Sequence, residues 1–118
     1  LNYDKVPDGF LNGFIDLIFE HNGRYHVLDW KSNHLGNNVA NYTADKLDEA
    51  MTNSNYHLQY LIYSIALYRY LKQVLGSQFD YDTHMGNVYY LFFRGLRSGQ
   101  STGVFATKIP LEVLQQFD

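Results

Sequence analysis

The sequence has 118 residues, of which 46% are hydrophobic and 18% charged, and it contains no cysteine. This composition predicts one globular domain and excludes an intrinsically disordered chain. The lack of cysteine excludes disulfides and thiolate metal sites and fits a reducing compartment. The net charge of −3 gives no sign of the basic stripe that is typical of a free-standing nucleic-acid binder.

The start of the chain gives two further expectations. It begins with Leu1 rather than Met, which indicates an excised piece of a longer protein. No secretory signal opens the chain, and no apolar run approaches the length that crosses a bilayer. We therefore expect no membrane partner.

A β-hairpin is predicted near the N-terminus. Residues 13–19 and 24–31 are rich in β-branched and aromatic residues, and Asn22-Gly23 stands between them. An Asn-Gly pair between two apolar runs is the strongest short-range hairpin signal, because a type I′ turn needs positive φ at both positions.

The rest of the chain predicts alternating helices and strands. Residues 32–43 are rich in Asn and Gly and predict a loop, and Thr43 is the expected cap of a helix that runs to about Asn53. Apolar spacings of three and four predict a long helix, and Gly76 follows it. The later elements that these patterns predict are, in chain order, helix Tyr56–Leu75, strand Val88–Phe93, strand Val104–Lys108 and a short closing helix that begins at Pro110. This order predicts an α/β sandwich with a mixed sheet.

Counting residue pairs across the predicted hairpin places two acidic residues opposite each other. If Asn22 and Gly23 form the turn, the numbers of paired residues sum to 45, and Asp16 lies directly opposite Asp29. Opposed side chains share one face with Cβ atoms about 4.5–5.5 Å apart, where like charges destabilise the pair. A hard divalent cation such as Mg²⁺ would relieve this repulsion. The alternative is that both acids face solvent on an amphipathic hairpin.

Lys31 belongs to the same patch, because strand side chains alternate and Lys31 lies two residues beyond Asp29. Two carboxylates, a metal ion and a lysine are the groups that phosphodiester hydrolysis needs. The ion lowers the pKa of bound water, and the lysine orients or deprotonates that water or offsets transition-state charge. The opposite face, with Leu17, Leu28 and Trp30, is the expected core face.

Gln59 and Tyr63 form a second candidate group. They are four residues apart and share one side of the long helix, away from its predicted apolar stripe of Leu58, Ile62 and Ile65. An amide and a phenol can contact a phosphate or a metal-bound water. The alternative is an ordinary helix position, since the chain has 11 tyrosines. The histidines show no zinc spacing, although His34 follows Lys31 closely.

These segments resemble a known family. The residues that carry the resemblance are Gly13-Phe14-Ile15-Asp16-Leu17, Leu28-Asp29-Trp30-Lys31-Ser32-Asn33, Gln59-Tyr60-Leu61-Ile62-Tyr63 and Tyr89-Tyr90-Leu91-Phe92-Phe93-Arg94-Gly95. They are similar to the PD-(D/E)xK nuclease superfamily and, more narrowly, to the C-terminal nuclease domain of the exodeoxyribonuclease V beta subunits, the RecB family. The resemblance implies a restriction-endonuclease-like α/β core, with a central mixed β-sheet flanked by helices.

The resemblance also implies roles for individual residues. Asp16 and Asp29 would bind Mg²⁺, with Mn²⁺ as a substitute, and the backbone carbonyl of Trp30 would complete that side of the metal site. Lys31 would be catalytic together with Asp29. Gln59 and Tyr63 would support the catalytic site from the adjacent helix. The family's further metal ligand, a His on an upstream helix, has no counterpart here, so residues 1–118 would form one nuclease domain whose upstream helix is missing.

The wider function follows from the same resemblance. The expected activity is that of a metal-dependent deoxyribonuclease in an ATP-driven helicase–nuclease of the bacterial cytoplasm. Its partners would be DNA and the gamma and alpha subunits, and it would degrade linear duplex DNA and prepare ends for recombinational repair. The alternatives are a stand-alone exonuclease of the same superfamily, an inactive docking module with the same fold, and an unrelated hydrolase with a carboxylate pair.

Overall fold

The hairpin forms as predicted in the part of the chain that the computed structural model describes, residues 17–118. Strands β1 (Leu17–His21) and β2 (Arg24–Lys31) are antiparallel, and every described pair sums to 45. Asn22 and Gly23 have φ values of 54° and 79°, the positive values that a type I′ turn needs. The predicted partner of Asp29 across the hairpin, Asp16, lies outside the described residues.

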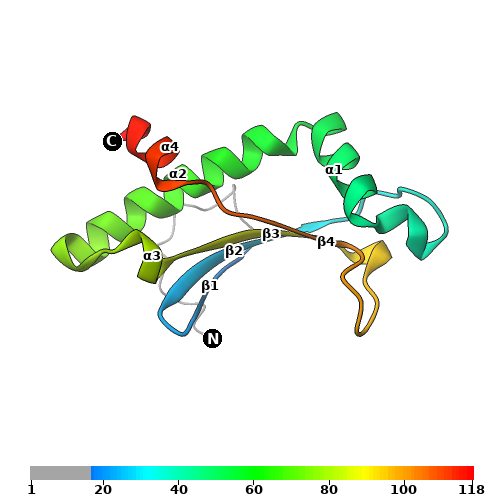
Figure 1. The fold of residues 1–118 in the computed structure, drawn as a ribbon, viewed down its shortest axis with the longest axis horizontal. Coiled ribbons are helices and arrows are strands. Elements are labelled where there is room, and N and C mark those ends of the chain that lie inside the picture. The colour runs from blue at the N-terminus through cyan, green and yellow to red at the C-terminus, as the bar shows by residue number, and fades with distance from the viewer. Residues whose placement is uncertain (1–16) are drawn as a thin grey trace.

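The hairpin is one half of a four-stranded mixed sheet of order β1-β2-β3-β4. Strand β3 (Met85–Phe92) runs parallel to β2, and β4 (Val104–Thr107) is antiparallel to β3. A parallel pair needs a long crossover connection, and the helices between β2 and β3 provide it. The sheet is therefore mixed, as the sequence predicted (Figure 1).

Two helices form the crossover, and their bounds agree with the sequence prediction. Helix α1 spans Ala44–Asn53 and helix α2 spans Tyr56–Leu75. Thr43 is the N-cap residue of α1, but its hydroxyl group bonds the Ala40 carbonyl (3.5 Å) and makes no capping hydrogen bond. Gly76, with a φ of 56°, ends α2, because this conformation strains residues that carry a Cβ atom.

The remaining elements are short. Helix α3 (Tyr81–His84) was not predicted, although Asp80 is a good N-cap and its side chain accepts a hydrogen bond from the Thr83 amide (3.0 Å). Helix α4 (Leu111–Leu114) directly follows Pro110, close to the predicted closing helix. The 3₁₀ turns are Val39–Tyr42, Gly76–Gln78, Phe93–Gly95 and Gln115–Phe117. None of the described helices has both the length and the apolar character of a membrane span.

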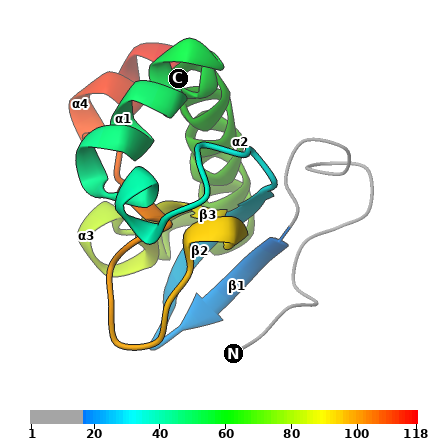
Figure 2. The same ribbon diagram turned by 90° about the vertical axis from the view of Figure 1, so that its right-hand side faces the viewer.

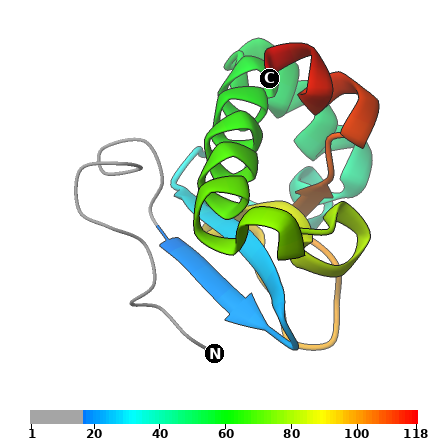
Figure 3. The same ribbon diagram turned by 90° about the vertical axis from the view of Figure 1, so that its left-hand side faces the viewer.

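The helices α1, α2 and α4 lie on one side of the sheet (Figures 1, 2 and 3). The core forms between this layer and the sheet. Its fully buried side chains come from β2, β3 and the helices, and they include Val27, Leu47, Met51, Leu67, Leu71, Tyr90, Phe92 and Leu114. The sheet face that points to α2 therefore decides which residues of β2 become buried.

That face is the one that carries Asp29, and here the sequence prediction was wrong. Ile18, Val27 and Asp29 are buried, whereas Trp30 on the opposite face is 50% exposed. The predicted helix stripe was also wrong in its first half, because Leu58 and Ile62 are exposed. Both faces of the hairpin are apolar enough to form a core, and the packing of α2 selects between them.

Candidate active site

Asp29 is a buried carboxylate in the middle of the sheet. It lies on β2, which has β1 on one side and β3 on the other, and α2 covers its face, so only 4% of the residue is exposed. Its Oδ2 atom accepts a hydrogen bond from the Tyr63 hydroxyl group (2.8 Å) and pairs with the Lys31 Nζ atom (3.2 Å). A buried carboxylate is stable only with such partners.

Lys31 stands at the end of β2 with its ammonium group turned toward Asp29. The same Nζ atom donates a hydrogen bond to Gln59 Oε1 (3.2 Å). It also lies 4.1 Å from the centre of the Tyr56 ring and 5.1 Å from that of Tyr90. Two oxygen acceptors and two aromatic faces therefore surround one cation.

Helix α2 supplies the other predicted residues. Gln59 and Tyr63 are one helical turn apart and both point to β2, Gln59 toward Lys31 and Tyr63 toward Asp29. The fold thus brings together Asp29, Lys31, Gln59 and Tyr63, as expected from the sequence. Trp30 lies between the two charged residues in the chain, with its side chain on the other face of the sheet.

Two tyrosines of the site were missed by the sequence reasoning. Tyr90 lies beside Asp29 in the parallel β2–β3 register, and its hydroxyl group donates to Gln59 Oε1 (2.6 Å). Burial, and then the neighbouring Tyr63 and Asp29, raise the pKa of Tyr90 far above its usual value of 10, so the hydroxyl group remains a donor. Tyr56 contributes its ring to Lys31. With 11 tyrosines in the chain, only the long-range register of β3 distinguishes Tyr90 from the others.

The loop after Lys31 is tied to the neighbouring elements. Arg94 Nε donates to the Ser32 carbonyl (2.9 Å), and the Tyr56 hydroxyl group donates to Asn33 Oδ1 (3.2 Å). His34, which the sequence placed close to the site, is exposed and bonds Asn37 (3.0 Å). These contacts fix the chain where it leaves β2, and His34 does not contact the Asp29–Lys31 pair.

The side-chain and backbone groups beside Lys31 in the described part of the chain include oxygen atoms of the kind that bind hard metal ions. Residues 17–118 contain no group of three His, Cys, Asp or Glu side chains that could hold an ion by themselves. Asp29 is the carboxylate of the described site, and Asp16, its predicted partner in metal binding, lies outside the described residues. A carboxylate and a backbone carbonyl, that of Trp30, are ligands that suit Mg²⁺ or Mn²⁺ rather than a soft metal.

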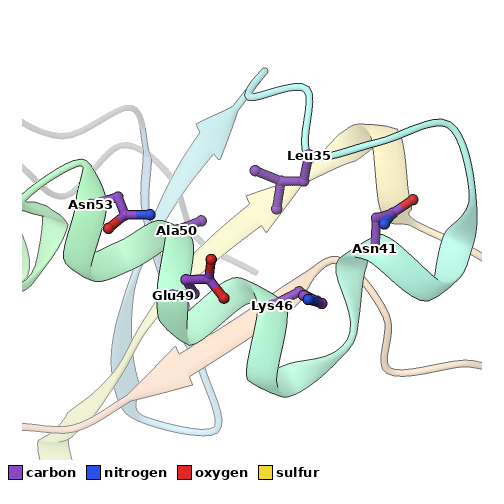
Figure 4. A pocket seen from close by; sticks show the side chains of 6 residues that line it. All are labelled: Leu35, Asn41, Lys46, Glu49, Ala50 and Asn53. Atoms are coloured by element: carbon purple, nitrogen blue, oxygen red, sulfur yellow. The ribbon is translucent and has the colours of Figure 1, made fainter.

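A separate pocket of about 170 Å³ lies between α1 and the loop that follows β2 (Figure 4). Its lining is mostly polar and consists of Leu35, Asn41, Lys46, Glu49, Ala50 and Asn53. None of these six residues belongs to the group around Asp29 and Lys31. This pocket is therefore separate from the Asp29–Lys31 pair beneath α2.

The chain matches the family model of the PD-(D/E)XK nuclease superfamily over residues 3–115. It belongs to the PD-(D/E)XK nuclease superfamily. Its four-stranded mixed sheet with flanking helices is the fold of this superfamily, as the sequence predicted.

Several curated relatives carry the name RecBCD enzyme subunit RecB, and the predicted similarity to RecB is thus confirmed. The chain is 41% identical to that of Haemophilus influenzae over 118 residues, which cover 100% of the chain and 10% of the relative. It is 45% identical to that of Escherichia coli over 101 residues (85% and 8%). For Mycobacterium tuberculosis strain H37Rv the identity is 41% over 117 residues (91% and 10%). The chain therefore spans about a tenth of the length of these RecB relatives.

Proposed function

We propose that residues 1–118 are the nuclease domain of a longer protein and hydrolyse DNA phosphodiesters with the help of Mg²⁺. The observation that carries this proposal is the buried Asp29–Lys31 ion pair, with Nζ and Oδ2 3.2 Å apart, which Gln59 and Tyr63 of α2 contact. Membership of a superfamily of nucleases supports the same reaction.

In this proposal Asp29, Asp16 and the Trp30 carbonyl hold the metal ion. A divalent ion bound there lowers the pKa of its water and neutralises phosphoryl oxygens. Tyr63 fixes the Asp29 carboxylate by donating to Oδ2. Lys31 supplies positive charge beside the position where the attacked phosphate becomes more negative, and Gln59 holds that ammonium group in place.

The wider context of the proposal comes from the relatives. We propose that the full-length protein is the nuclease-bearing subunit of an ATP-driven helicase–nuclease, in which gamma and alpha subunits are its partners and linear duplex DNA is its substrate. The relatives named RecBCD enzyme subunit RecB support this context. Because bacterial DNA lies in the cytoplasm, the proposed place of action is the cytoplasm.

The first test removes the lysine. In the full-length protein, Lys31→Ala is expected to slow the degradation of linear DNA by about 100-fold or more, the usual effect of losing one group that stabilises transition-state charge. Lys72→Ala is the matched control, because Lys72 also pairs with an aspartate, Asp118 (2.8 Å), at the exposed end of α2. Wild-type cleavage by the Lys31 variant would remove Lys31 from the mechanism.

The second test concerns the metal ion. Titration of the nucleotide-free full-length protein with Mn²⁺, followed by electron paramagnetic resonance, should detect one bound ion fewer in Asp29→Asn than in the wild type. The change keeps the shape of the side chain and removes the charge that binds the ion. Asp45→Asn, an exposed acid in the first turn of α1, should bind as many ions as the wild type. Equal Mn²⁺ binding by Asp29→Asn would place the metal elsewhere.

A further inference from the structure

We propose that Tyr90 is a positioning residue that holds Lys31 in place through the side-chain amide of Gln59. The inference rests on the proposed nuclease function of this site and adds a residue from a third element, β3. Its basis is a chain of two hydrogen bonds, from the Tyr90 hydroxyl group to Gln59 Oε1 (2.6 Å) and from Lys31 Nζ to the same oxygen (3.2 Å).

These two bonds determine the orientation of the amide. A carbonyl oxygen has two lone pairs, and here a hydroxyl group and an ammonium group occupy both. If the amide were turned over, its NH₂ group would face the Lys31 ammonium group, and two donors would oppose each other. In the observed orientation Oε1 holds Lys31, and within residues 17–118 the Nε2 group makes no hydrogen bond. In the proposed reaction this NH₂ group is the part of the amide that would contact a phosphate oxygen of the substrate.

The position of Tyr90 suits this role. The residue is completely buried and lies beside Asp29 in the register of β2 and β3, so the sheet itself fixes its distance from the ion pair. The centre of its ring lies 5.4 Å from that of Tyr56, which is next to Lys31, and 6.4 Å from that of Tyr63, which is next to Asp29. A second contact of the hydroxyl group, with the Tyr56 carbonyl, is longer at 3.4 Å. The short bond to Gln59 is therefore the main contact of the Tyr90 hydroxyl group.

Tyr90→Phe in the full-length protein tests the hydroxyl group and leaves the ring in place. We expect kcat for linear DNA to fall about 10-fold, as for the loss of one hydrogen bond, with KM for DNA unchanged. Tyr89→Phe is the matched control, because Tyr89 is the adjacent residue of β3 on the other sheet face, where its hydroxyl group accepts from Asn87 (3.1 Å). It should have wild-type kinetics.

A double variant shows whether Tyr90 acts through Gln59. If it does, Tyr90→Phe should have almost no further effect on kcat in a Gln59→Ala background. An equal fall in both backgrounds, or no fall in the wild-type background, would overturn the inference. Lys31→Ala, measured alongside, tests the proposed function separately: full activity in that variant contradicts the assignment of the site, whatever Tyr90 does.

Chemical labelling gives a readout that does not need nuclease activity. Brief acetylation followed by mass spectrometry measures the reactivity of Lys31, with the exposed Lys72 as an internal reference. We expect Tyr90→Phe to raise the labelling of Lys31 several-fold relative to Lys72, because a loosened Gln59 no longer holds the ammonium group, whereas Tyr89→Phe should not. Unchanged labelling in Tyr90→Phe would contradict the positioning role.

Discussion

Asp29 and Lys31 depend on each other because both are largely buried, with 6% and 13% of their side chains exposed. Removing one partner of a buried ion pair leaves an uncompensated charge and costs about 3–5 kcal/mol. A loss of activity after Lys31→Ala can therefore combine lost chemistry with local unfolding. Substitutions that keep the pair and change its neighbours separate these two effects.

Gln59→Glu is such a substitution. The new carboxylate keeps an oxygen acceptor for Lys31 and Tyr90, which now donate to Gln59 at 3.2 Å and 2.6 Å, and loses the NH₂ group. It also brings negative charge close to where a phosphate would bind. We expect KM for DNA to rise and kcat to fall, while the acetylation of Lys31 does not increase. Wild-type kinetics in this variant would show that the NH₂ group does not contact the substrate.

At the level of elements, local rules predicted the hairpin and α2, and long-range packing determined the rest. Asn22-Gly23 fixes the register of β1 and β2, and Gly76 ends α2, so short stretches of sequence were sufficient. The buried face of β2 depends on where a helix that begins 25 residues beyond Lys31 packs. Alternation along the strand could place Asp29 and Lys31 on one face, but could not decide that this face is the core.

A buried histidine, His26, should make the pairing of β2 and β3 sensitive to pH. The register shifts between Tyr25 and Val27, and the ring of the intervening His26 is buried and accepts a hydrogen bond from the Asn87 amide through Nδ1 (3.0 Å). Burial, and then the charge of Arg24, lower the pKa of His26 below its usual value of 6.5. A protonated ring would be desolvated and could no longer accept this bond at Nδ1.

We therefore expect the pairing of β2 and β3 to weaken in acid. Since the pKa of His26 is lower in the folded state, the unfolded state binds the proton first, and stability falls as the pH drops below about 6.5 until the folded pKa is reached. Hydrogen exchange of the peptide 85–92 in the full-length protein, corrected for intrinsic rates, should show protection decreasing from pH 7.5 to 5.5. His26→Gln should flatten this dependence, and His34→Gln in the exposed loop after β2 should leave it unchanged. A wild-type dependence in His26→Gln would exclude His26 as the cause.

At the scale of the whole molecule, the described helices cover the two faces of the sheet unequally. The helices α1, α2 and α4 lie on one side of the sheet (Figures 2 and 3), and this is the face that carries the buried Asp29. The Trp30 side chain lies on the other face. Trp30 is 50% exposed on that face, and Phe93, which directly follows β3, is 49% exposed. A sheet with two apolar faces is stable when both are covered, and the chain spans only about a tenth of its RecB relatives. If the protein acts on DNA as proposed, the net charge of −3 implies that most of its contacts with DNA come from parts outside residues 1–118.

In the full-length protein this second sheet face should be covered by the remaining polypeptide. Hydroxyl-radical footprinting with mass spectrometry measures this, because oxidation of a side chain follows its exposure. We expect Trp30 and Phe93 to be oxidised much more slowly than half-exposed aromatic side chains normally are. Leu58 and Val74, which are 52% and 54% exposed on α2, provide a reference within the same chain. If Trp30 and Phe93 react as their present exposure predicts, the sheet remains open on that side and its aromatic face is free to contact DNA or another subunit.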